Sequence, residues 1–353
     1  MDLSKLRKKI DRVDENILKL LNERTKCVLE IGKIKSKHGK HFYVPHREQK
    51  IISTLIKKNK GPFPRESLKE IFREILTTSR TLQKKLRVAY FGPEATFTHL
   101  AAIKKFGRNA EFIPGKSISD VFDEVEKGRA DYGVVPIENS TEGVVNHTLD
   151  MFIDSDLKIC AEIITDIAHN LVSKSTNMAR IKKIYSHPQA IAQSRNWIED
   201  NLPNAQLVEV ASTAKAAAMA SKSASCGAIA SRLAAVLYKL NIVANNIEDK
   251  ADNVTRFLVI GKTLPEVSGE DKTSVMFSIK DRVGALYDML IPFRKNNINL
   301  TKIESRPSKR KAWEYIFFVD FMGHVKNTRV KKALDELSKQ CVFLKVLGSY
   351  PRS

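Results

Sequence analysis

The stretch Asn246–Gly261 reads NIEDKADNVTRFLVIG and changes character halfway along its length. Its first half is polar and prone to turns, whereas Phe257–Ile260 is an apolar run typical of a buried strand. Thr255 and Arg256 stand at the junction, where the start of a rigid strand can hold a hydroxyl and a guanidinium in place. An arginine there can bind a carboxylate through two parallel hydrogen bonds, although most charged side chains are simply solvated.

The residues before this stretch alternate between short apolar runs and helical patterns, which predicts an α/β domain with parallel strands. Strands are expected at residues 87–91, 111–113, 132–136, 158–164, 183–186, 206–210, 228–230 and 256–260, and helices at 98–106, 119–127, 189–201 and 213–221. Ligands of such sheets bind at the carboxyl ends of the strands. The loops expected there are rich in hydroxyls, amides and helix-capping residues, and they are 92–99, 136–148, 186–190 and 211–213. Helix N-termini that converge on one cleft would favour an anion, and the lack of a glycine-rich loop after the first strand disfavours a nucleotide.

The N-terminal residues show a helical pattern instead. An apolar seam recurs at three- and four-residue steps through Leu3, Leu6, Ile10, Val13, Ile17 and Leu20. A helix over residues 4–37 would be roughly 50 Å long at about 1.5 Å per residue, so its seam needs partner helices and a second subunit. Two more helices are expected, one from Pro45 and one after the turn GPFPRES.

Polar residues interrupt all three apolar helical faces. Arg24 and Lys35 lie on the first face or beside it, Glu48 on the edge of the second, and the third contains Ser79 and Gln83. Burying such groups is costly unless they are paired. Two explanations remain open: mutual pairing in a bundle core, including an Arg24–Glu48 ion pair, or a polar pocket that binds an anionic ligand.

The C-terminal part follows a short polar linker at residues 264–271. The pattern there predicts strands and helices in the order βαββαβ, a ferredoxin-like plan. The expected bounds are strand 273–279, helix 283–295, strand 298–305, strand 313–321, helix 328–340 and strand 342–347.

Composition sets outer limits on function. The chain has 353 residues and a formal net charge of +20, but its basic residues are spread over predicted helix faces rather than gathered in one tract. A diffuse positive field can attract small polyanionic substrates as well as nucleic acid, and no basic motif with interleaved aromatic residues is present. The four cysteines, Cys27, Cys160, Cys226 and Cys341, have no paired spacing for zinc. No apolar run approaches the roughly 20 residues of a membrane span, so we expect a cytoplasmic protein with reduced thiols.

Three groups of motifs, in this order, make the chain similar to a known family. The N-terminal part resembles the all-helical chorismate mutase domains through LRKKIDRVDENILKLLNER, IGKIK and HRE. The middle resembles prephenate dehydratase domains through VAYFGPEATFTHLAA, GVVPIENSTEGVVNHTLD, SHPQAIAQSRNWI and the stretch quoted first. The C-terminal part resembles ACT regulatory domains through DRVGALYDML and NLTKIESRPSK. The chain is thus identified as a member of the bifunctional chorismate mutase–prephenate dehydratases, the P-proteins of phenylalanine biosynthesis.

The resemblance implies three domains. These are an all-α mutase domain at residues 1–85, a two-lobed α/β dehydratase domain similar to periplasmic binding proteins at 86–262, and a ferredoxin-like ACT domain at 270–350. The expected reactions are the rearrangement of chorismate to prephenate and the dehydration and decarboxylation of prephenate to phenylpyruvate. No cofactor and no metal are implied.

In the mutase domain, the resemblance implies roles for polar residues on the helical faces. Arg7, Arg24 and Arg47 would bind the two carboxylates of the substrate, Lys35 and Gln83 would face the ether oxygen, and Glu48 the ring hydroxyl with Ser79 nearby. The rearrangement is unimolecular, so the site need only hold a compact conformer and stabilise charge on the ether oxygen. Val44 departs from the family, because some relatives have an acidic residue there. Arg7 would reach the site of a neighbouring subunit, which implies an intertwined homodimer.

In the dehydratase domain, the resemblance places the site in a cleft between the lobes. Its expected lining is Asn139, Ser186, Gln193, Thr213, Thr255 and Arg256. The leaving hydroxyl needs a proton donor, which we assign to Thr255, while Arg256 would hold the carboxylate of the pyruvyl side chain. Glu138, His187 or a water remains an alternative acid.

In the ACT domain, two segments match the phenylalanine-binding segments of the family. They are Gly284-Ala285-Leu286 and Glu304-Ser305-Arg306-Pro307. The resemblance therefore implies L-phenylalanine as a feedback inhibitor.

Two rival functions follow from other features of the sequence. An amino-acid-sensing regulatory or binding protein with a DNA-contacting arm would need a recognition helix, whereas the N-terminal part has a long seam with buried polar groups. A mutase fused to prephenate dehydrogenase would need a dinucleotide-binding fingerprint, which the sequence lacks.

Overall fold

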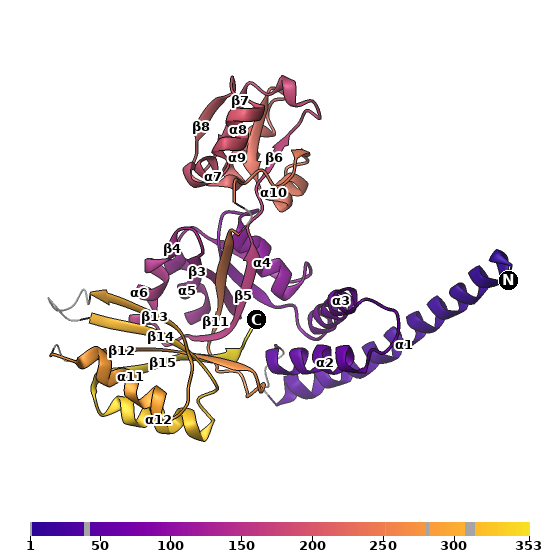
Figure 1. Ribbon diagram of the computed structural model, residues 1–353. Coiled ribbons are helices and arrows are strands. Elements are labelled where there is room, and N and C mark those ends of the chain that lie inside the picture. Colours follow the sequence, from indigo (N-terminus) through magenta and orange to yellow (C-terminus); the bar gives the residue numbers. More distant parts are fainter. Residues whose placement is uncertain (1, 39–42, 251, 280–281, 308–314) are drawn as a thin grey trace. The chain divides into compact units, whose positions relative to one another are not determined.

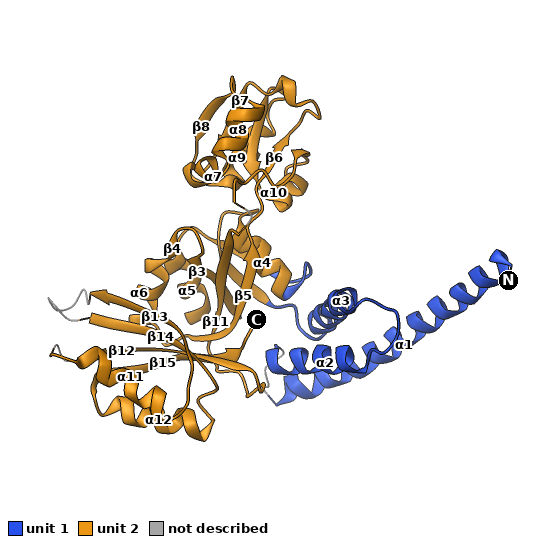
Figure 2. Ribbon diagram, in the orientation of Figure 1, with its two compact units in different colours: residues 1–86, 106–111 blue, residues 87–105, 112–353 orange. Residues whose placement is uncertain are grey.

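The computed structural model describes residues 2–38, 43–250, 252–279, 282–307 and 315–353. Its internal contacts divide the chain into two compact units (Figure 2). Unit 1 comprises residues 1–86 and 106–111, and unit 2 comprises residues 87–105 and 112–353.

Unit 1 contains the three helices that the seams predict. They are α1 (Leu3–Lys37), α2 (Pro45–Lys58) and α3 (Arg65–Gln83). Asp2 caps α1 by accepting a hydrogen bond from the Ser4 amide, and Pro45 occupies the first position of α2. In α1 the buried residues are Val28 and Gly32, and the N-terminal half of the helix extends beyond α2 and α3 (Figure 1).

Unit 2 begins with a first lobe built on a mixed sheet. Its strands are β1 (Arg87–Phe91), β2 (Glu111–Gly115), β3 (Tyr132–Asn139), β4 (Gly143–Val144), β5 (Lys158–Asp166) and β11 (Val254–Gly261), in the order β2-β1-β3-β11-β5 with β4 beside β3. Its helices are α4 (Phe97–Phe106), α5 (Ile118–Glu126) and α6 (Asn146–Asp154). The internal strand β11 comes last in the chain and lies between β3 and β5 (Figure 1).

The second lobe is inserted between β5 and β11. Its sheet has the order β10-β6-β9-β7-β8, formed by β6 (Asn170–Ser173), β7 (Lys183–Ser186), β8 (Gln206–Glu209), β9 (Cys226–Ala230) and β10 (Asn241–Ala244). The helical segments are the 3-10 turn Met178–Arg180, α7 (Pro188–Gln193), α8 (Arg195–Asn201), α9 (Thr213–Ala220) and α10 (Arg232–Leu237). Where the chain crosses between the lobes, Ile167 N donates to Asn253 O (2.8 Å) and Ile247 N donates to His169 O (2.8 Å).

The expectation of parallel strands is wrong for β11 in the first lobe and for β6 in the second. β11 runs antiparallel to β3 and β5, and β6 runs antiparallel to β9 and β10, whereas β1–β3, β7–β8 and β7–β9 are parallel pairs. The physical reason is the insertion, because β11 returns from the second lobe rather than through a crossover helix. The pattern also missed β4, β6, β10, α6 and α10, and the helix expected at 189–201 is broken at Ser194.

The C-terminal domain confirms the βαββαβ order. It consists of β12 (Asp271–Ile279), α11 (Ala285–Lys295), β13 (Leu300–Pro307), β14 (Tyr315–Met322), α12 (Thr328–Ser338) and β15 (Cys341–Pro351), with the sheet order β13-β14-β12-β15. Both helices cover one face of this sheet (Figure 1). The other face shares a hydrophobic core with the first lobe, to which the sheet contributes Met276, Ile316, Phe318, Leu347 and Tyr350.

Gly348 allows β15 to lie close to β5 in this shared core. A Cβ atom on Gly348 would stand 2.4 Å from the carbonyl oxygen of Ile159, closer than real Cβ contacts occur. The backbone of β15 therefore packs directly against the backbone of β5 at this point.

Candidate active sites

In unit 1, the helices bring most of the predicted mutase residues together. Arg24 donates a hydrogen bond to Ser79 Oγ, and Gln83 Nε2 donates to Val28 O (3.0 Å). Gly32 lets α3 approach α1, because a Cβ at this position would stand 3.0 Å from Gln83 Cγ. The polar residues of α1 and α3 thus meet across a close helix–helix contact.

Glu48 is paired differently from the ion pair that the sequence left open. Its carboxylate accepts a hydrogen bond from Arg80 Nη1 (2.8 Å) rather than from Arg24. Arg80 is 4% exposed, and its guanidinium carbon lies 4.7 Å from the centroid of the Tyr43 ring. Sequence reasoning missed Arg80, although it stands four residues after the buried Leu76 on the same face of α3.

The cluster is electropositive and partly removed from water. Burial lowers the pKa of Lys35, and the Glu48 carboxylate opposes that shift. Burial also lowers the pKa of Arg24. Arg7 and Arg47, by contrast, are exposed on α1 and α2. The cluster therefore contains Arg24, Lys35, Glu48, Ser79 and Gln83, and a polyanion would find cations on its walls.

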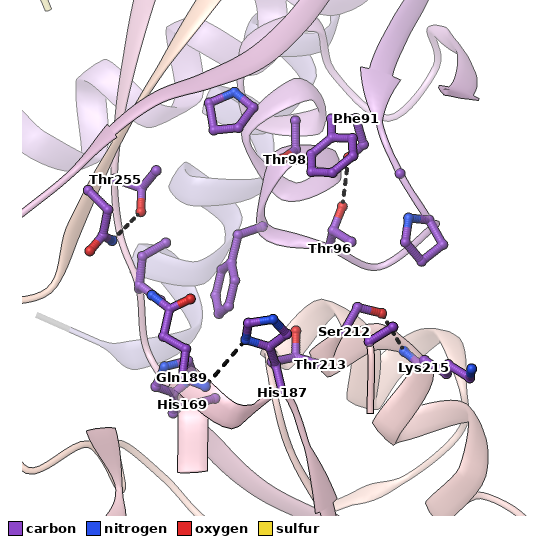
Figure 3. A pocket seen from close by; sticks show the side chains of 18 of the residues that line it. Phe91, Thr96, Thr98, His169, His187, Gln189, Ser212, Thr213, Lys215 and Thr255 are labelled. Atoms are coloured by element: carbon purple, nitrogen blue, oxygen red, sulfur yellow. Dashed lines mark hydrogen bonds between the residues drawn. The ribbon is translucent and has the colours of Figure 1, made fainter. Parts of the chain in front are cut away.

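Unit 2 contains a cavity of about 750 Å³ lined by both lobes. Figure 3 shows Phe91, Thr96, Thr98 and Thr255 of the first lobe facing His187, Ser212, Thr213 and Lys215 of the second. Of the predicted dehydratase residues, Asn139, Gln193, Thr213 and Thr255 line it. The loops at the ends of the strands thus converge on one cleft.

The Thr255 hydroxyl is oriented by a neighbouring amide. Asn139 lies opposite Thr255 in the β3–β11 ladder, and its Nδ2 donates to Thr255 Oγ1 (2.8 Å). The Oδ1 atom of Asn139 is fixed in turn, since it accepts from the amides of Thr141 (2.9 Å) and Glu142 (3.1 Å). Because Thr255 Oγ1 acts as an acceptor here, its own proton remains available to a ligand.

A row of hydrogen bonds runs from Thr255 to the point where the chain crosses between the lobes. Asn139 Nδ2 also donates to Asn253 Oδ1 (2.8 Å), and Asn253 Nδ2 donates to Gln193 Oε1 (2.9 Å). His169 Nε2 lies 2.9 Å from the same oxygen, so this nitrogen carries a proton. Burial lowers the pKa of His169, which favours the neutral imidazole. Sequence reasoning missed Asn253 and His169, although each stands near a strand end.

Arg256 does not line the cavity, which contradicts its predicted role as the carboxylate clamp. Successive residues of a strand face opposite sides of the sheet, so Arg256 points away from the side that Thr255 faces. Its guanidinium donates to Glu162, Asp320 and Tyr350. Glu138, an alternative acid, lies on the same far side and pairs with Lys302 (2.8 Å).

Ser186 and His187 also have structural contacts. Ser186 is fully buried, and its hydroxyl donates to Ile229 O (2.9 Å), which ties β7 to β9 and leaves the side chain outside the cavity lining. The predicted substrate contact at Ser186 is therefore not formed by this geometry. His187 lines the cavity and caps α7, since its Nδ1 accepts from the Gln189 amide (3.4 Å).

Two lysines line the cavity, together with Glu142, and supply the cations that the sequence reasoning assigned to Arg256. Lys116 comes from the first lobe and Lys215 from the second, and both are exposed. The N-terminus of α9 adds to this charge, with Ser212 Oγ accepting from the Lys215 amide (3.1 Å). The arrangement can bind an anion and offer it a hydroxyl donor.

The two predicted phenylalanine segments lie on the C-terminal domain. Gly284 caps α11 with a φ of 78°, a left-handed conformation that favours glycine, and Ala285 and Leu286 begin the helix. Glu304–Pro307 end β13. Arg306 pairs with Asp150 of α6 (2.9 Å) and donates to Asn146 O.

Two features are absent from the part of the chain that the structure describes. No cluster of three or more His, Cys, Asp or Glu side chains in it could hold a metal ion. In the same residues, no helix is long and apolar enough to cross a membrane.

Family models match the chain in three consecutive regions. Chorismate mutase type II matches residues 6–84, prephenate dehydratase residues 88–264, and the ACT domain residues 273–339.

Whole-chain relatives show the same arrangement. The chain is 54% identical to a bifunctional chorismate mutase/prephenate dehydratase of Aquifex aeolicus, over 100% of this chain and 98% of the relative. A protein of the same description from Pseudomonas aeruginosa is 43% identical over 99% and 98%.

Solved structures of prephenate dehydratases are similar to about three quarters of the chain. A prephenate dehydratase of Arthrobacter aurescens in complex with L-Phe is 36% identical, with a TM-score of 0.70 over 76% of this chain and 90% of that one. The prephenate dehydratase of Staphylococcus aureus is 32% identical, with a TM-score of 0.67 over 75% and 100%. The chain therefore belongs to the family of bifunctional chorismate mutase/prephenate dehydratases.

Proposed function

We propose that the helical cluster of unit 1 rearranges chorismate and that the cavity of unit 2 converts prephenate to phenylpyruvate. The observation that carries the second assignment is the hydrogen bond from Asn139 to Thr255, which presents a hydroxyl proton at the cavity wall. The partly buried cations Arg24 and Lys35 support the first assignment.

In the mutase step, the protein needs no acid, base or nucleophile. Lys35 and Gln83 stabilise the negative charge that grows on the ether oxygen as its carbon–oxygen bond breaks. Arg24 binds a carboxylate, with Ser79 fixing its guanidinium, and Glu48 accepts from the ring hydroxyl. Arg80 holds the Glu48 carboxylate in place (2.8 Å).

In the dehydratase step, one carboxylate leaves as carbon dioxide and its bonding electrons complete the aromatic ring. The ring hydroxyl departs at the same time and needs a proton or a strong hydrogen bond, which Thr255 supplies. Lys116, Lys215 and the N-terminus of α9 bind the pyruvyl carboxylate, while Asn139, Gln193 and Thr213 orient the substrate. The departing carboxylate stays weakly bound, because its charge disappears in the transition state.

A homodimer completes the mutase site in this proposal. The apolar seam of α1 from Leu3 to Leu20 is between 40% and 63% exposed in the single chain, a face that a second copy would cover. Arg7 lies on that half of α1, from which it would reach the partner's cluster. The four free cysteines support a reducing, cytoplasmic location.

L-Phenylalanine is the proposed effector of the C-terminal domain. Support comes from the Arthrobacter relative, which was solved with L-Phe. The segments 284–286 and 304–307 would bind the amino acid. Calorimetry should detect its binding, and millimolar L-phenylalanine should slow the dehydratase reaction.

The deciding experiment supplies chorismate to purified protein without any added cofactor. We expect phenylpyruvate to form. Arg24→Ala should stop chorismate consumption but still convert supplied prephenate. Accumulation of prephenate by the unmodified protein would remove the dehydratase assignment, and unchanged chorismate would remove the mutase assignment.

A further inference from the structure

The β3–β11 ladder has two faces that connect different parts of unit 2. On one face, Asn139 and Thr255 are opposite each other and line the cavity. On the other face, the next pair in register, Glu138 and Arg256, points at the C-terminal sheet. We name Glu138 and Arg256 the back pair.

The geometry points to the back pair as the link through which the C-terminal domain acts on the dehydratase site. We propose that Asp320 positions Arg256, that Arg256 and Glu138 thereby set the Asn139–Thr255 hydrogen bond, and that an effector of the C-terminal domain changes the dehydratase rate through these contacts. The proposal rests on the dehydratase and effector assignments above.

The Arg256 guanidinium is held from three directions. Its Nε donates to Glu162 of β5 (2.8 Å), its Nη1 to Asp320 of β14 (2.6 Å), and its Nη2 to Tyr350 of β15 (2.9 Å). Burial alone would lower the pKa of Arg256, but Tyr350, Asp320 and Glu162 together raise it above the ordinary value. The guanidinium is thus fully charged and has few alternative positions.

The partners of Arg256 are themselves fixed by the C-terminal sheet. Ser274 of β12 lies 2.5 Å from Asp320 Oδ1, to which it donates, and 2.7 Å from the Tyr350 hydroxyl. Lys272 of β12 pairs with Glu162 (2.8 Å). A displacement of β12, β14 or β15 would therefore move charged partners of one strand, β11.

Glu138 supplies a second connection to the same domain. It pairs with Lys302 of β13 (2.8 Å), which stands two residues before the proposed effector segment at 304–307. Asn139 and Thr255 are therefore each next in sequence to a residue that is ion-paired to the C-terminal sheet. Breaking the buried pairs that Arg256 forms with Glu162 and Asp320 leaves uncompensated charges, so the positions of these three side chains are strongly coupled.

The test compares variants of the full-length protein by two measurements, L-phenylalanine binding and dehydratase inhibition. Asp320→Asn keeps the shape of the side chain but removes its charge. Tyr350→Phe removes another hydrogen-bond partner of Arg256, and it replaces Asp320→Asn in the test if that variant folds poorly. Lys345→Met is the matched control, because Lys345 of β15 also connects the C-terminal sheet to the first lobe, but through the carbonyls of Phe152 and Ser155 (3.0 and 2.7 Å).

We expect Asp320→Asn and Tyr350→Phe to bind L-phenylalanine with a Kd within about twofold of the unmodified protein. The concentration for half-inhibition should nevertheless rise at least about fivefold relative to that Kd, the lower end of typical coupling between sites. Lys345→Met should keep the unmodified ratio, and mutase turnover in unit 1 provides an internal standard for all three.

Other outcomes overturn the proposal. Unchanged inhibition in both variants would show that the back pair does not carry the coupling, and equal loss in Lys345→Met would show general loosening of the domain. An unmodified protein that converts prephenate but ignores L-phenylalanine also overturns it. Failure of the unmodified protein to convert prephenate is a separate result, because it refutes the dehydratase assignment first.

Discussion

Thr255 and Arg256 are adjacent in the sequence, but Thr255 lines the cavity and Arg256 contacts the C-terminal sheet. The sequence motif drew attention to both residues and placed both in the substrate cleft. Alternation along a strand already forbids this, because neighbours point to opposite faces. Thr255 could thus be predicted to lie at the cleft, whereas the partners of Arg256 come from β5, β14 and β15 and no local pattern reveals them.

Replacement of Thr255 by Ala should lower the dehydratase kcat by about 10²- to 10⁴-fold, the usual contribution of a positioned acid. Thr255→Ser should keep most of the rate because it keeps the hydroxyl. The measurement is phenylpyruvate formation from prephenate. Thr165→Ala is the matched control, since Thr165 lies opposite Thr255 on β5 and outside the cavity lining. A full rate in Thr255→Ala would transfer the role of acid to His187 or a water.

The mutase pH profile should report Lys35. A lowered pKa means that the lysine loses its proton at a lower pH than an ordinary lysine does, and the neutral amine cannot stabilise the ether oxygen. The mutase kcat/KM should therefore fall as pH rises through this pKa, while the acid side of the profile is unaffected by Lys35. Lys35→Arg, in which the charge persists, should move the loss to higher pH. An identical alkaline limb in that variant would contradict the assignment.

At the scale of elements, segments with strong periodicity could be predicted from the sequence, whereas some short strands could not. The seams predicted α1, α2 and α3, and the apolar runs predicted β1, β7 and β11 close to their observed bounds. β6 and β10 were missed although β7, which has the same length of four residues, was predicted, so a run this short does not by itself identify a strand. The antiparallel course of β11 depends on an insertion, which is a property of the chain path rather than of any segment.

The exposed half of α1 carries a prediction of its own. Ile10→Glu places a charge in the seam, so it should weaken self-association and lower the mutase rate. Burying one such side chain contributes about 1.5–3 kcal/mol per subunit, so the dimer dissociation constant should rise at least about tenfold. Sedimentation at several concentrations measures this.

Lys8→Glu changes charge on the same helix but away from the seam, and it should leave association intact. Should Ile10→Glu associate as tightly as the unmodified protein, the seam is not the subunit contact.

At the scale of the whole molecule, the motifs indicated three domains but not their contacts. The shared core between the first lobe and the C-terminal sheet is invisible in the sequence, because Met276 and Phe318 read as ordinary strand residues. Gly348 could have been noticed only as a glycine inside a strand, which often marks a close backbone approach.

Gly348→Ala tests how tightly the C-terminal sheet is fitted. The added Cβ would meet the Ile159 carbonyl at 2.4 Å, so β15 or β5 must shift, at a cost of about 1–3 kcal/mol. The midpoint of thermal unfolding should fall. Gly61→Ala meets its nearest atom only at 3.8 Å and should be close to neutral. Equal midpoints for the two variants would mean that the close approach has no energetic effect.

Because the second lobe is inserted between β5 and β11, the first lobe can be completed on the ribosome only after the second lobe has been synthesised. β3 and β5 emerge before the second lobe, whereas β11, the strand that joins them, emerges after it. Until then their facing edges keep unpaired N–H and C=O groups, which can pair with other chains. The apolar face of this sheet that packs against the C-terminal sheet stays exposed for longer still, until β15 has been synthesised. A transcript that stops after β5 and before β11 should therefore yield an aggregating product rather than a smaller working enzyme.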